Sequence, residues 1–227
     1  MKIDFTNKNV LVTGGSRGIG AKLVEDFINL GANVVSTSTK DLDFKNKQLT
    51  EVFLDSVKDV SFDVCINNAG INIIADFCDI NDEDWENIIQ VNLTGAYKIC
   101  KAVSKTMIQK KSGKIVNISS IWGNISKKGR AAYSSSKFGL KGLTLGMAAE
   151  LAEYNILVNS VSPGFTRTDL TEQVLGPAGI KEVESLIPIK RLATTEEISK
   201  AVLFLCSDLN TYISGHDLIV DGGFCKT

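Results

Sequence analysis

The sequence predicts an α/β fold in which helices cover both faces of one doubly wound parallel sheet. Short β-favouring apolar runs alternate with longer segments of helical spacing. A glycine-rich loop joins the first strand to the first helix, and polar loops follow several later strands. No internal repeat, low-complexity tract or linker divides the chain, so we expect a single domain over residues 1–227.

Each element follows from a local pattern. Apolar runs bounded by turn residues predict strands at residues 9–13, 33–38, 63–67, 114–119, 157–162 and 217–220. Helical spacing predicts helices at residues 19–30, 48–57, 81–111, 132–154, 171–186 and 195–207. Gly31 suits the end of the first helix, and Asn81 precedes three acids that suit a first helical turn. The helix at 171–186 is the weakest, because Gly176 and Pro177 interrupt it.

The charge balance excludes several functions. With 25 Lys and Arg against 26 Asp and Glu, the chain has a net charge of −1 and lacks the basic excess of a nucleic-acid binder. Its one histidine, His216, cannot supply the imidazoles of a typical catalytic zinc site, so no metal is expected. A Ser-His-Asp triad would depend on the same residue. The chemistry therefore has to use other side chains.

The sequence carries no signal for a membrane or for secretion. No run of about 18 apolar residues is present, and residues 1–9 contain no apolar signal-peptide core. The five cysteines include no C-x-x-C pair, so we expect free thiols. Free thiols are typical of a reducing compartment, which favours a cytoplasmic location.

A glycine-rich loop connects the first predicted strand and helix. Gly14, Gly18 and Gly20 have the spacing G-x-x-x-G-x-G, which lets the backbone turn tightly and approach a ligand closely. The N–H groups and the positive dipole end of the following helix favour a pyrophosphate. Because a strand precedes the loop and a helix follows it, we predict dinucleotide binding rather than a plain turn.

Three further polar loops fall just after predicted strands. They are Asn-Asn-Ala-Gly at residues 67–70, Ser-Ser at 119–120 and Pro-Gly at 163–164. In a doubly wound sheet, ligands bind beyond the carboxyl ends of the strands. We therefore expect these loops and the glycine-rich loop to line one crevice.

Tyr133 and Lys137 are four residues apart at the start of a predicted helix, so their side chains share one face. An isolated pair of this kind is usually surface packing. Ser120 ends the preceding strand, and Asn92 lies within the long helix before that strand. The four residues together favour a catalytic group over chance spacing.

These motifs resemble those of the classical short-chain dehydrogenases/reductases over essentially the whole chain. The matching patterns are T-G-x-x-x-G-I-G at 13–20, N-N-A-G at 67–70, Asn92, Ser120, Y-x-x-x-K at 133–137, P-G at 163–164 and D-G-G at 221–223. The segment I-P-I-K-R-L at 187–192, followed by E-E-I, also resembles bacterial 3-oxoacyl-carrier-protein reductases and their relatives. The resemblance implies a Rossmann-like fold.

The resemblance also implies a role for each residue. Tyr133 would exchange a proton with the substrate oxygen, with its pKa shifted from about 10 toward the working pH by Lys137. Lys137 would also hold the nicotinamide ribose, Ser120 would bind the substrate carbonyl, and Asn92 would anchor a water that leads to solvent. The expected cofactor contacts are Gly14, Ser16, Arg17, Gly18, Ile19, Gly20, Thr39, Asp43, Asn68, Ala69, Gly70, Tyr133, Lys137, Pro163, Gly164, Thr166 and Thr168.

The end of the second strand bears on which nicotinamide cofactor is bound. Enzymes that use NAD(H) commonly place an acid there, whereas this chain has no acid before Asp41. In similar reductases the residues corresponding to Arg17 and Thr39 contact the 2′-phosphate, and arginine suits a dianion. These residues favour NADP(H). NAD(H) stays possible, because Arg17 and Lys40 can equally be solvated surface cations.

The chain departs from the family after the second strand. Related chains usually have a helix before the acid that contacts adenine, but only residues 39–42 precede the corresponding Asp43 here. A parallel crossover needs about a dozen residues or more. Either the sheet loses a strand on this side or the segment is irregular, and both alternatives leave the assignment of Asp43 open.

Residues 168–191 correspond to the substrate loop of the family, and Trp122, Phe165 and Leu170 are the expected pocket residues. The leading expectation is reduction of a 3-oxoacyl thioester, as a small molecule or bound to a carrier. Two alternatives stay open: a reductase or dehydrogenase of a sugar, polyol or other small alcohol, and a non-catalytic dinucleotide-binding sensor or scaffold. A homodimer or homotetramer is implied, with no nucleic acid or membrane as partner.

Overall fold

The computed structural model describes residues 2–226, apart from the side chain of Leu170. Six parallel strands form one sheet in the order β2-β1-β3-β4-β5-β6. The strands are β1 (Asn9–Thr13), β2 (Asn33–Ser36), β3 (Val64–Asn67), β4 (Gly113–Ile118), β5 (Ile156–Pro163) and β6 (Asp217–Val220). The strand order reverses direction beside β1, as in a doubly wound fold, so the predicted fold class is confirmed.

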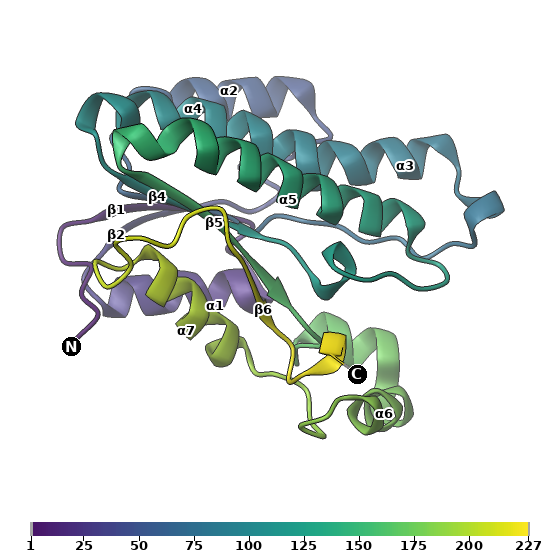
Figure 1. Cartoon of the computed structure of the whole chain (residues 1–227). Coiled ribbons are helices and arrows are strands. Elements are labelled where there is room, and N and C mark those ends of the chain that lie inside the picture. Colours follow the sequence, from purple (N-terminus) through teal and green to yellow (C-terminus); the bar gives the residue numbers. More distant parts are fainter. Residues whose placement is uncertain (1, 227) are drawn as a thin grey trace.

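Helices cover both faces of the sheet (Figure 1). On one face lie α1 (Gly18–Asn29) and α7 (Thr195–Cys206), and on the other lie α2 (Lys47–Val57), α4 (Gly95–Lys110) and α5 (Ala131–Leu151). Helix α3 (Asp82–Ile89) leads into α4. Helix α6 (Asp169–Leu186) stands beyond the end of β5 and is kinked at Gly176, directly before Pro177.

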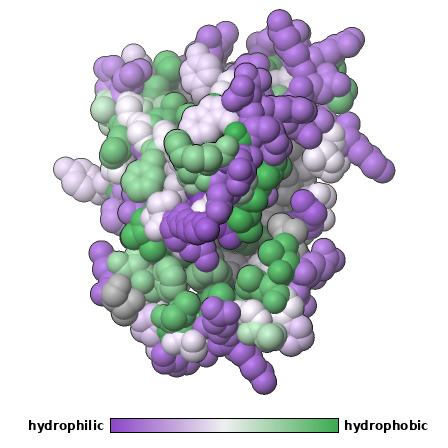
Figure 2. All heavy atoms as spheres, turned by 90° about the vertical axis from the view of Figure 1, so that its right-hand side faces the viewer, coloured by the Kyte–Doolittle hydropathy of each residue, from purple (hydrophilic) through white to green (hydrophobic). Residues whose placement is uncertain are grey.

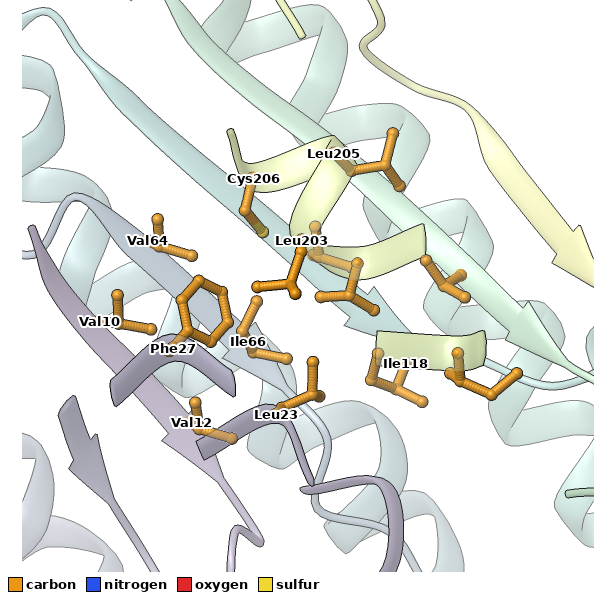
Figure 3. Close-up of a cluster of buried hydrophobic side chains, with 14 of the residues drawn as sticks. Val10, Val12, Leu23, Phe27, Val64, Ile66, Ile118, Leu203, Leu205 and Cys206 are labelled. Atoms are coloured by element: carbon orange, nitrogen blue, oxygen red, sulfur yellow. The ribbon is translucent and has the colours of Figure 1, made fainter. Parts of the chain in front are cut away.

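Alternation along the strands divides the core into two layers. Val10 and Val12 of β1 pack with Phe27 of α1 on the side of the sheet that α7 also covers (Figure 3). Leu11, between them, packs on the opposite face with residues of α4 such as Ile99. Because successive side chains of a strand point to opposite faces and both faces are covered, apolar residues occupy successive positions, as in Val10, Leu11 and Val12.

The edge of the sheet at β2 shows what replaces the helix that related chains have after the second strand. Among the described residues no strand follows β2 before α2, and residues 37–46 form turns. Leu42 and Phe44 of this segment are buried, and the Phe44 ring lies so close to Gly95 that a Cβ there would come within 2.7 Å of it. The sheet therefore ends at β2, and an irregular but packed segment connects it to α2.

Several predicted elements differ from the structure: the helix predicted at 132–154 ends at Leu151, and the helix predicted at 171–186 begins at Asp169. The helix predicted at residues 81–111 contains a π-helical segment, η2 (Gln90–Thr94), between α3 and α4. Strand β2 ends at Ser36 and not at residue 38. The π-helical segment carries Asn92, and such segments are frequent at functional sites.

No helix within residues 2–226 is both long and apolar enough to cross a lipid bilayer.

Candidate active site

The loops after β1, β3, β4 and β5 gather at the carboxyl edge of the sheet, at the right of Figure 1. Figure 2 looks onto this side of the molecule, where hydrophobic residues in green lie among hydrophilic side chains in purple. The four loops that the sequence singled out are therefore brought to one edge, as parallel strands require.

The glycine-rich loop has a backbone conformation that favours glycine and is packed too closely for side chains. Gly14 and Gly18 have φ values of 66° and 55°. A Cβ on Gly20 would lie 2.2 Å from the carbonyl oxygen of Gly14 and 2.4 Å from Nδ2 of Asn68. Helix α1 behind the loop has no side-chain N-cap and no acid in its first turn. Its N–H groups and positive dipole end thus remain suited to an anion.

Hydrogen bonds join the segment after β3 to this loop. The Asn68 side chain donates to the carbonyl oxygens of Gly14, at 2.8 Å, and of Thr13, at 3.2 Å. The Thr13 hydroxyl accepts from the backbone N–H groups of Asn68 and Ala69. Gly70 faces Lys137 of the predicted catalytic group, because a Cβ there would lie 3.6 Å from Nζ of Lys137.

The segment after β5 approaches the glycine-rich loop from the other side. Pro163 ends β5, and Gly164 packs so closely on Asp221 that a Cβ would come within 2.8 Å of its Cα. The Thr166 hydroxyl donates to the carbonyl oxygen of Gly164. Thr168 is the N-cap of α6, and its Cγ2 lies 3.4 Å from the position of a Cβ on Gly18. Predicted cofactor residues from three loops thus lie close together.

The residues expected around the adenosine are less well gathered. Ser16, Arg17 and Thr39 are exposed, and Ile19 is half-buried behind them in α1. The Asp43 carboxylate accepts from the N–H of Lys45 and closes a local turn, so its assignment to adenine remains a prediction.

Asp41 was not expected to matter at this end of the site. Its carboxylate accepts from the backbone N–H and the hydroxyl of Ser38, at 2.8 and 2.7 Å, which places an acid just beyond β2. Sequence spacing missed it because the chain turns back after Ser38. An acid at this position favours the unphosphorylated ribose of NAD(H), whereas the exposed Arg17 favours the 2′-phosphate of NADP(H).

This donor set fits a dinucleotide. The cradle of glycines, the uncapped start of α1 and the exposed Arg17 all suit phosphate groups. Gly18 and Gly70 leave space that a side chain would fill, toward Thr168 and toward Lys137. A bound nicotinamide dinucleotide would lie along these residues, with its reactive ring toward Lys137.

Helix α5 presents Tyr133 and Lys137 on one face beside Ser120. The Lys137 ammonium lies 5.6 Å from the centroid of the Tyr133 ring and donates to the carbonyl oxygen of Ile118 at 2.8 Å. Ser120 is buried after β4, its hydroxyl accepts from the N–H of Trp122, and it hydrogen-bonds with Tyr133. The predicted catalytic residues from β4 and α5 are therefore neighbours.

The pKa values differ from the expectation. Burial raises the pKa of Tyr133, while the hydrogen bond from Ser120 and the charge of Arg130 lower it in part. Burial lowers the pKa of Lys137 to about 8. The pKa of Tyr133 is therefore not shifted toward the working pH as expected, because burial outweighs the groups that lower it, and Tyr133 is a protonated acid at neutral pH.

Asn92 holds the segment after β3 against α5. Its Oδ1 accepts from the N–H of Ile71 at 2.8 Å, and its Nδ2 donates to the carbonyl oxygen of Ile71 and to the hydroxyl of Ser136. Ser136 in turn donates to the carbonyl oxygen of Tyr133. Both the oxygen and the nitrogen of the Asn92 side chain are thus already hydrogen-bonded. That Asn92 anchors a water remains a prediction, and the water would bind to the backbone of the π-helical segment.

Three aromatic rings stack edge to face beside Ser120. Trp122 lies 6.1 Å from Phe165 and 6.3 Å from Phe224, and Phe165 lies 5.3 Å from Phe224. The predicted pocket residues Trp122 and Phe165 are thus together. The side chain of Leu170, the third, lies outside the described residues. Phe224 was missed, although its position directly after D-G-G could have indicated it.

A partly buried ion network supports the turn that follows Ser120. Asp217 of β6 pairs with Lys141 of α5 at 3.3 Å and accepts from Asn124 and Ser160. Lys141 also donates to Asn124 at 2.7 Å. These bonds connect α5, β5, β6 and the turn, and they fix Ser120 relative to Tyr133. No sequence motif indicated this network.

Lys137→Met is expected to remove activity while stabilising the fold. The fall in the Lys137 pKa from 10.5 to about 8 means that keeping this ammonium charged in the folded protein costs about 3 kcal/mol. Between these pH values the unfolded chain binds a proton that the folded chain releases, so wild-type stability rises with pH through that window. Urea unfolding should find the variant more stable at pH 7, with a smaller difference at pH 10. A variant less stable than wild type at pH 7 contradicts this.

Comparison with known proteins decides the family. The profile described as Enoyl-(Acyl carrier protein) reductase matches residues 45–225. The chain is 38% identical to 3-oxoacyl-[acyl-carrier-protein] reductase FabG of Buchnera aphidicola subsp. Schizaphis graminum, covering 100% of both chains. This chain belongs to the short-chain dehydrogenase/reductase family. It is also 35% identical to FabG of Aquifex aeolicus, over 98% of this chain and 99% of the other.

Solved structures of this family agree with the fold. A gluconate 5-dehydrogenase from Burkholderia cenocepacia in complex with NADP and tartrate has a TM-score of 0.88 and 26% identity, covering 99% of this chain and 97% of that one. ElxO with NADP bound has a TM-score of 0.90 and 30% identity, covering 98% and 100%. The alignment with the Buchnera enzyme spans 247 positions against 227 residues here, as expected for a shortened member. The chain is therefore an oxidoreductase of this family.

Proposed function

We propose that this protein reduces the keto group of a 3-oxoacyl thioester and uses NADPH as the reductant. The observation that carries the proposal is the placement of Tyr133 and Ser120 beside the Lys137 ammonium, next to a glycine cradle for a dinucleotide. The curated relatives named 3-oxoacyl-[acyl-carrier-protein] reductase support this substrate, and the NADP in related structures supports the cofactor.

Tyr133 acts as the proton donor to the substrate oxygen. Its raised pKa keeps the hydroxyl protonated at neutral pH, and Ser120 hydrogen-bonds with it. A keto oxygen placed between the two hydroxyls would accept from both and gain its proton from Tyr133. When bound, the reduced nicotinamide supplies the hydride.

Lys137 supports this transfer in two ways. Its ammonium lies near the Tyr133 ring, so it stabilises the phenolate left after the proton has moved. It also faces Gly70, where it would hold the ribose next to the reactive ring. Asn92 fixes the segment after β3 against α5 and so keeps Gly70 close to Lys137.

The predicted substrate loop, residues 168–191, would exclude water from the reaction. It contains α6, which is kinked at Gly176, and Thr168 at its start lies across from Gly18. A segment of this kind can close over a bound substrate. We assign the substrate contacts of Trp122, Phe165 and Leu170 to the same proposal.

A sugar or polyol reductase is the second candidate, and the similarity to a gluconate 5-dehydrogenase favours it. A non-catalytic sensor is disfavoured, because Asn92, Ser120, Tyr133 and Lys137 are all retained. The proton-donating group would be the same in both enzymes, so the choice of substrate is what separates them.

NADPH is expected to bind more tightly than NADH, because Arg17 is exposed beside the glycine-rich loop. Arg17→Ala should weaken NADPH binding about tenfold and leave NADH binding unchanged. Asp41→Asn is the companion variant, and it should improve NADPH binding by removing the acid beyond β2. Fluorescence titration of both cofactors measures these changes. Equal affinities of the wild type for NADPH and NADH would refute the role given to Arg17 and Thr39.

We also infer a homodimer or homotetramer built on α4 and α5, and a cytoplasmic location. Large apolar side chains on these helices are exposed in the single chain: Tyr97, Phe138 and Leu145. A second copy of the chain packed on these helices would cover them. The substrate is delivered as a small thioester or on a carrier.

A further inference from the structure

The turn that follows Ser120 is held in place by polar side chains that the proposed mechanism does not use. Backbone hydrogen bonds of 2.9 Å, from Gly123 to Ser120 and from Asn124 to Ile121, close this turn, which contains η3 (Ile121–Gly123). These bonds shape the turn but do not determine where it lies on the sheet. The side chain of Asn124 does so.

The Asn124 side chain bonds to three different elements. Its Nδ2 donates to the Asp217 carboxylate of β6 at 2.9 Å and to the Ser162 hydroxyl of β5 at 3.1 Å. Its Oδ1 accepts from the Lys141 ammonium of α5 at 2.7 Å. The same ammonium lies 3.3 Å from Asp217. One amide group therefore ties the turn to two strands and one helix.

The Asp217 carboxylate is anchored on β5. It accepts from the buried hydroxyls of Ser160, at 2.6 Å, and Ser162, at 2.8 Å. Burial raises the pKa of Asp217, but its hydrogen bonds and the charge of Lys141 lower it more, so the carboxylate is ionised at neutral pH. The cost of removing two charges from water offsets much of their attraction, so such a pair contributes little net stability. What it provides here is a fixed position for Asn124.

The turn transmits this position to the proposed reacting groups. The backbone N–H of Trp122 donates to the Ser120 hydroxyl at 3.2 Å, which leaves the proton of that hydroxyl for Tyr133 or for a keto oxygen. Gly123 packs so closely on α5 that a Cβ would lie 3.1 Å from the carbonyl oxygen of Lys137. A displaced turn would therefore change both the direction of the Ser120 hydroxyl and its distance from α5.

We propose that Asn124, held by Asp217 and Lys141, is a positioning residue that orients the Ser120 hydroxyl for reduction. It acts through the turn and not by contact with the substrate. The inference rests on the proposed reductase function, in which Ser120 donates to the keto oxygen. Because that hydrogen bond strengthens as negative charge develops on the oxygen, loss of the Asn124 side chain should lower kcat and leave KM and NADPH affinity nearly unchanged.

Asn124→Ala is the test variant, since it releases the turn while Asp217 and Lys141 stay paired. With NADPH and a 3-oxobutanoyl thioester, it should lower kcat about tenfold. In a Ser120→Ala background it should change kcat less than about twofold, because the hydroxyl that Asn124 orients is already absent. Lys141→Arg, which retains the charge, should lower kcat less than Lys141→Met.

Asn210→Ala is the matched control. The Asn210 side chain also makes three hydrogen bonds, all to the backbone of Leu205 and Ile213. Its carbonyl oxygen accepts from Lys114 at the start of β4, so the residue lies at the opposite edge of the sheet from the site. This variant should lose at least as much stability to urea as Asn124→Ala and keep the wild-type kcat.

Amide hydrogen exchange of Trp122 reports on the turn without turnover. Its N–H should exchange about tenfold faster in Asn124→Ala than in the wild type, and at the wild-type rate in Asn210→Ala. Unchanged exchange or unchanged kcat in Asn124→Ala would overturn the inference, and so would an equal fall in kcat with and without the Ser120 hydroxyl. If exchange accelerates but the wild type reduces no ketone, the placement of Ser120 by Asn124 stands and the proposed function fails.

Discussion

Tyr133→Phe is expected to lower kcat about 10²- to 10⁴-fold and to leave NADPH binding nearly intact. The hydroxyl is the only part of the side chain that is lost, and it is the group proposed to donate the proton. The phenylalanine ring keeps its place near the Lys137 ammonium, which lies 5.6 Å from the ring centroid in the wild type. Stopped-flow turnover and fluorescence titration of NADPH measure the two effects separately.

Tyr97→Phe is the matched control for this substitution. Tyr97 is an exposed residue of α4, and it should tolerate the same loss of a hydroxyl. Turnover retained by Tyr133→Phe would remove the tyrosine from the mechanism. An equal loss of cofactor binding in that variant would give the residue a structural role only.

Gly20→Ala is expected to destabilise the fold by about 3 kcal/mol and to weaken cofactor binding about 100-fold or more. The new methyl group would lie 2.2 Å from the Gly14 carbonyl oxygen and 2.4 Å from Nδ2 of Asn68. The loop would have to move, and the 2.8 Å hydrogen bond from Asn68 to Gly14 would break. Urea unfolding and NADPH titration measure both consequences.

Gly142→Ala is the control substitution, and it is expected to stabilise the fold. Gly142 lies on the helix that also carries Tyr133 and Lys137. Gly142 lies inside α5, and a Cβ there meets no atom within 4 Å. Because glycine is less favourable than alanine inside a helix, this variant should be about 0.5–1 kcal/mol more stable. A Gly20→Ala protein as stable as wild type, with intact NADPH binding, would contradict the proposed role of the loop.

Most of the fold could be predicted because its signals are local. Each strand is a short apolar run, and buried strands such as Val64–Asn67 need no tertiary information to be recognised. The π-helical segment Gln90–Thr94 could not be predicted, because one extra residue in a helical turn leaves no distinct pattern over so short a stretch. The end of β2 also depended on context, since Ser38 bonds to Asp41 and leaves the sheet.

The candidate site could likewise be predicted only where its signals are local in the sequence. Spacing placed Tyr133 and Lys137 on one helical face, and strand ends placed Ser120 and the glycine-rich loop nearby. Contacts between distant segments could not be inferred, such as Asn92 with Ser136 or Lys141 with Asp217. The pKa of Tyr133 was wrongly expected to fall, because the extent of burial is set by packing and not by sequence spacing.

The rate of NADPH oxidation with a 3-oxoacyl thioester, a ketosugar and a simple ketone tests the central claim most directly. The three substrates are compared by kcat/KM under the same conditions, with Tyr133→Phe as the blank. We predict that the thioester is reduced with the highest kcat/KM, with one NADPH consumed for each keto group lost. A higher value for the ketosugar would assign the enzyme to sugar chemistry, and no oxidation with any of the three would contradict a reductase altogether.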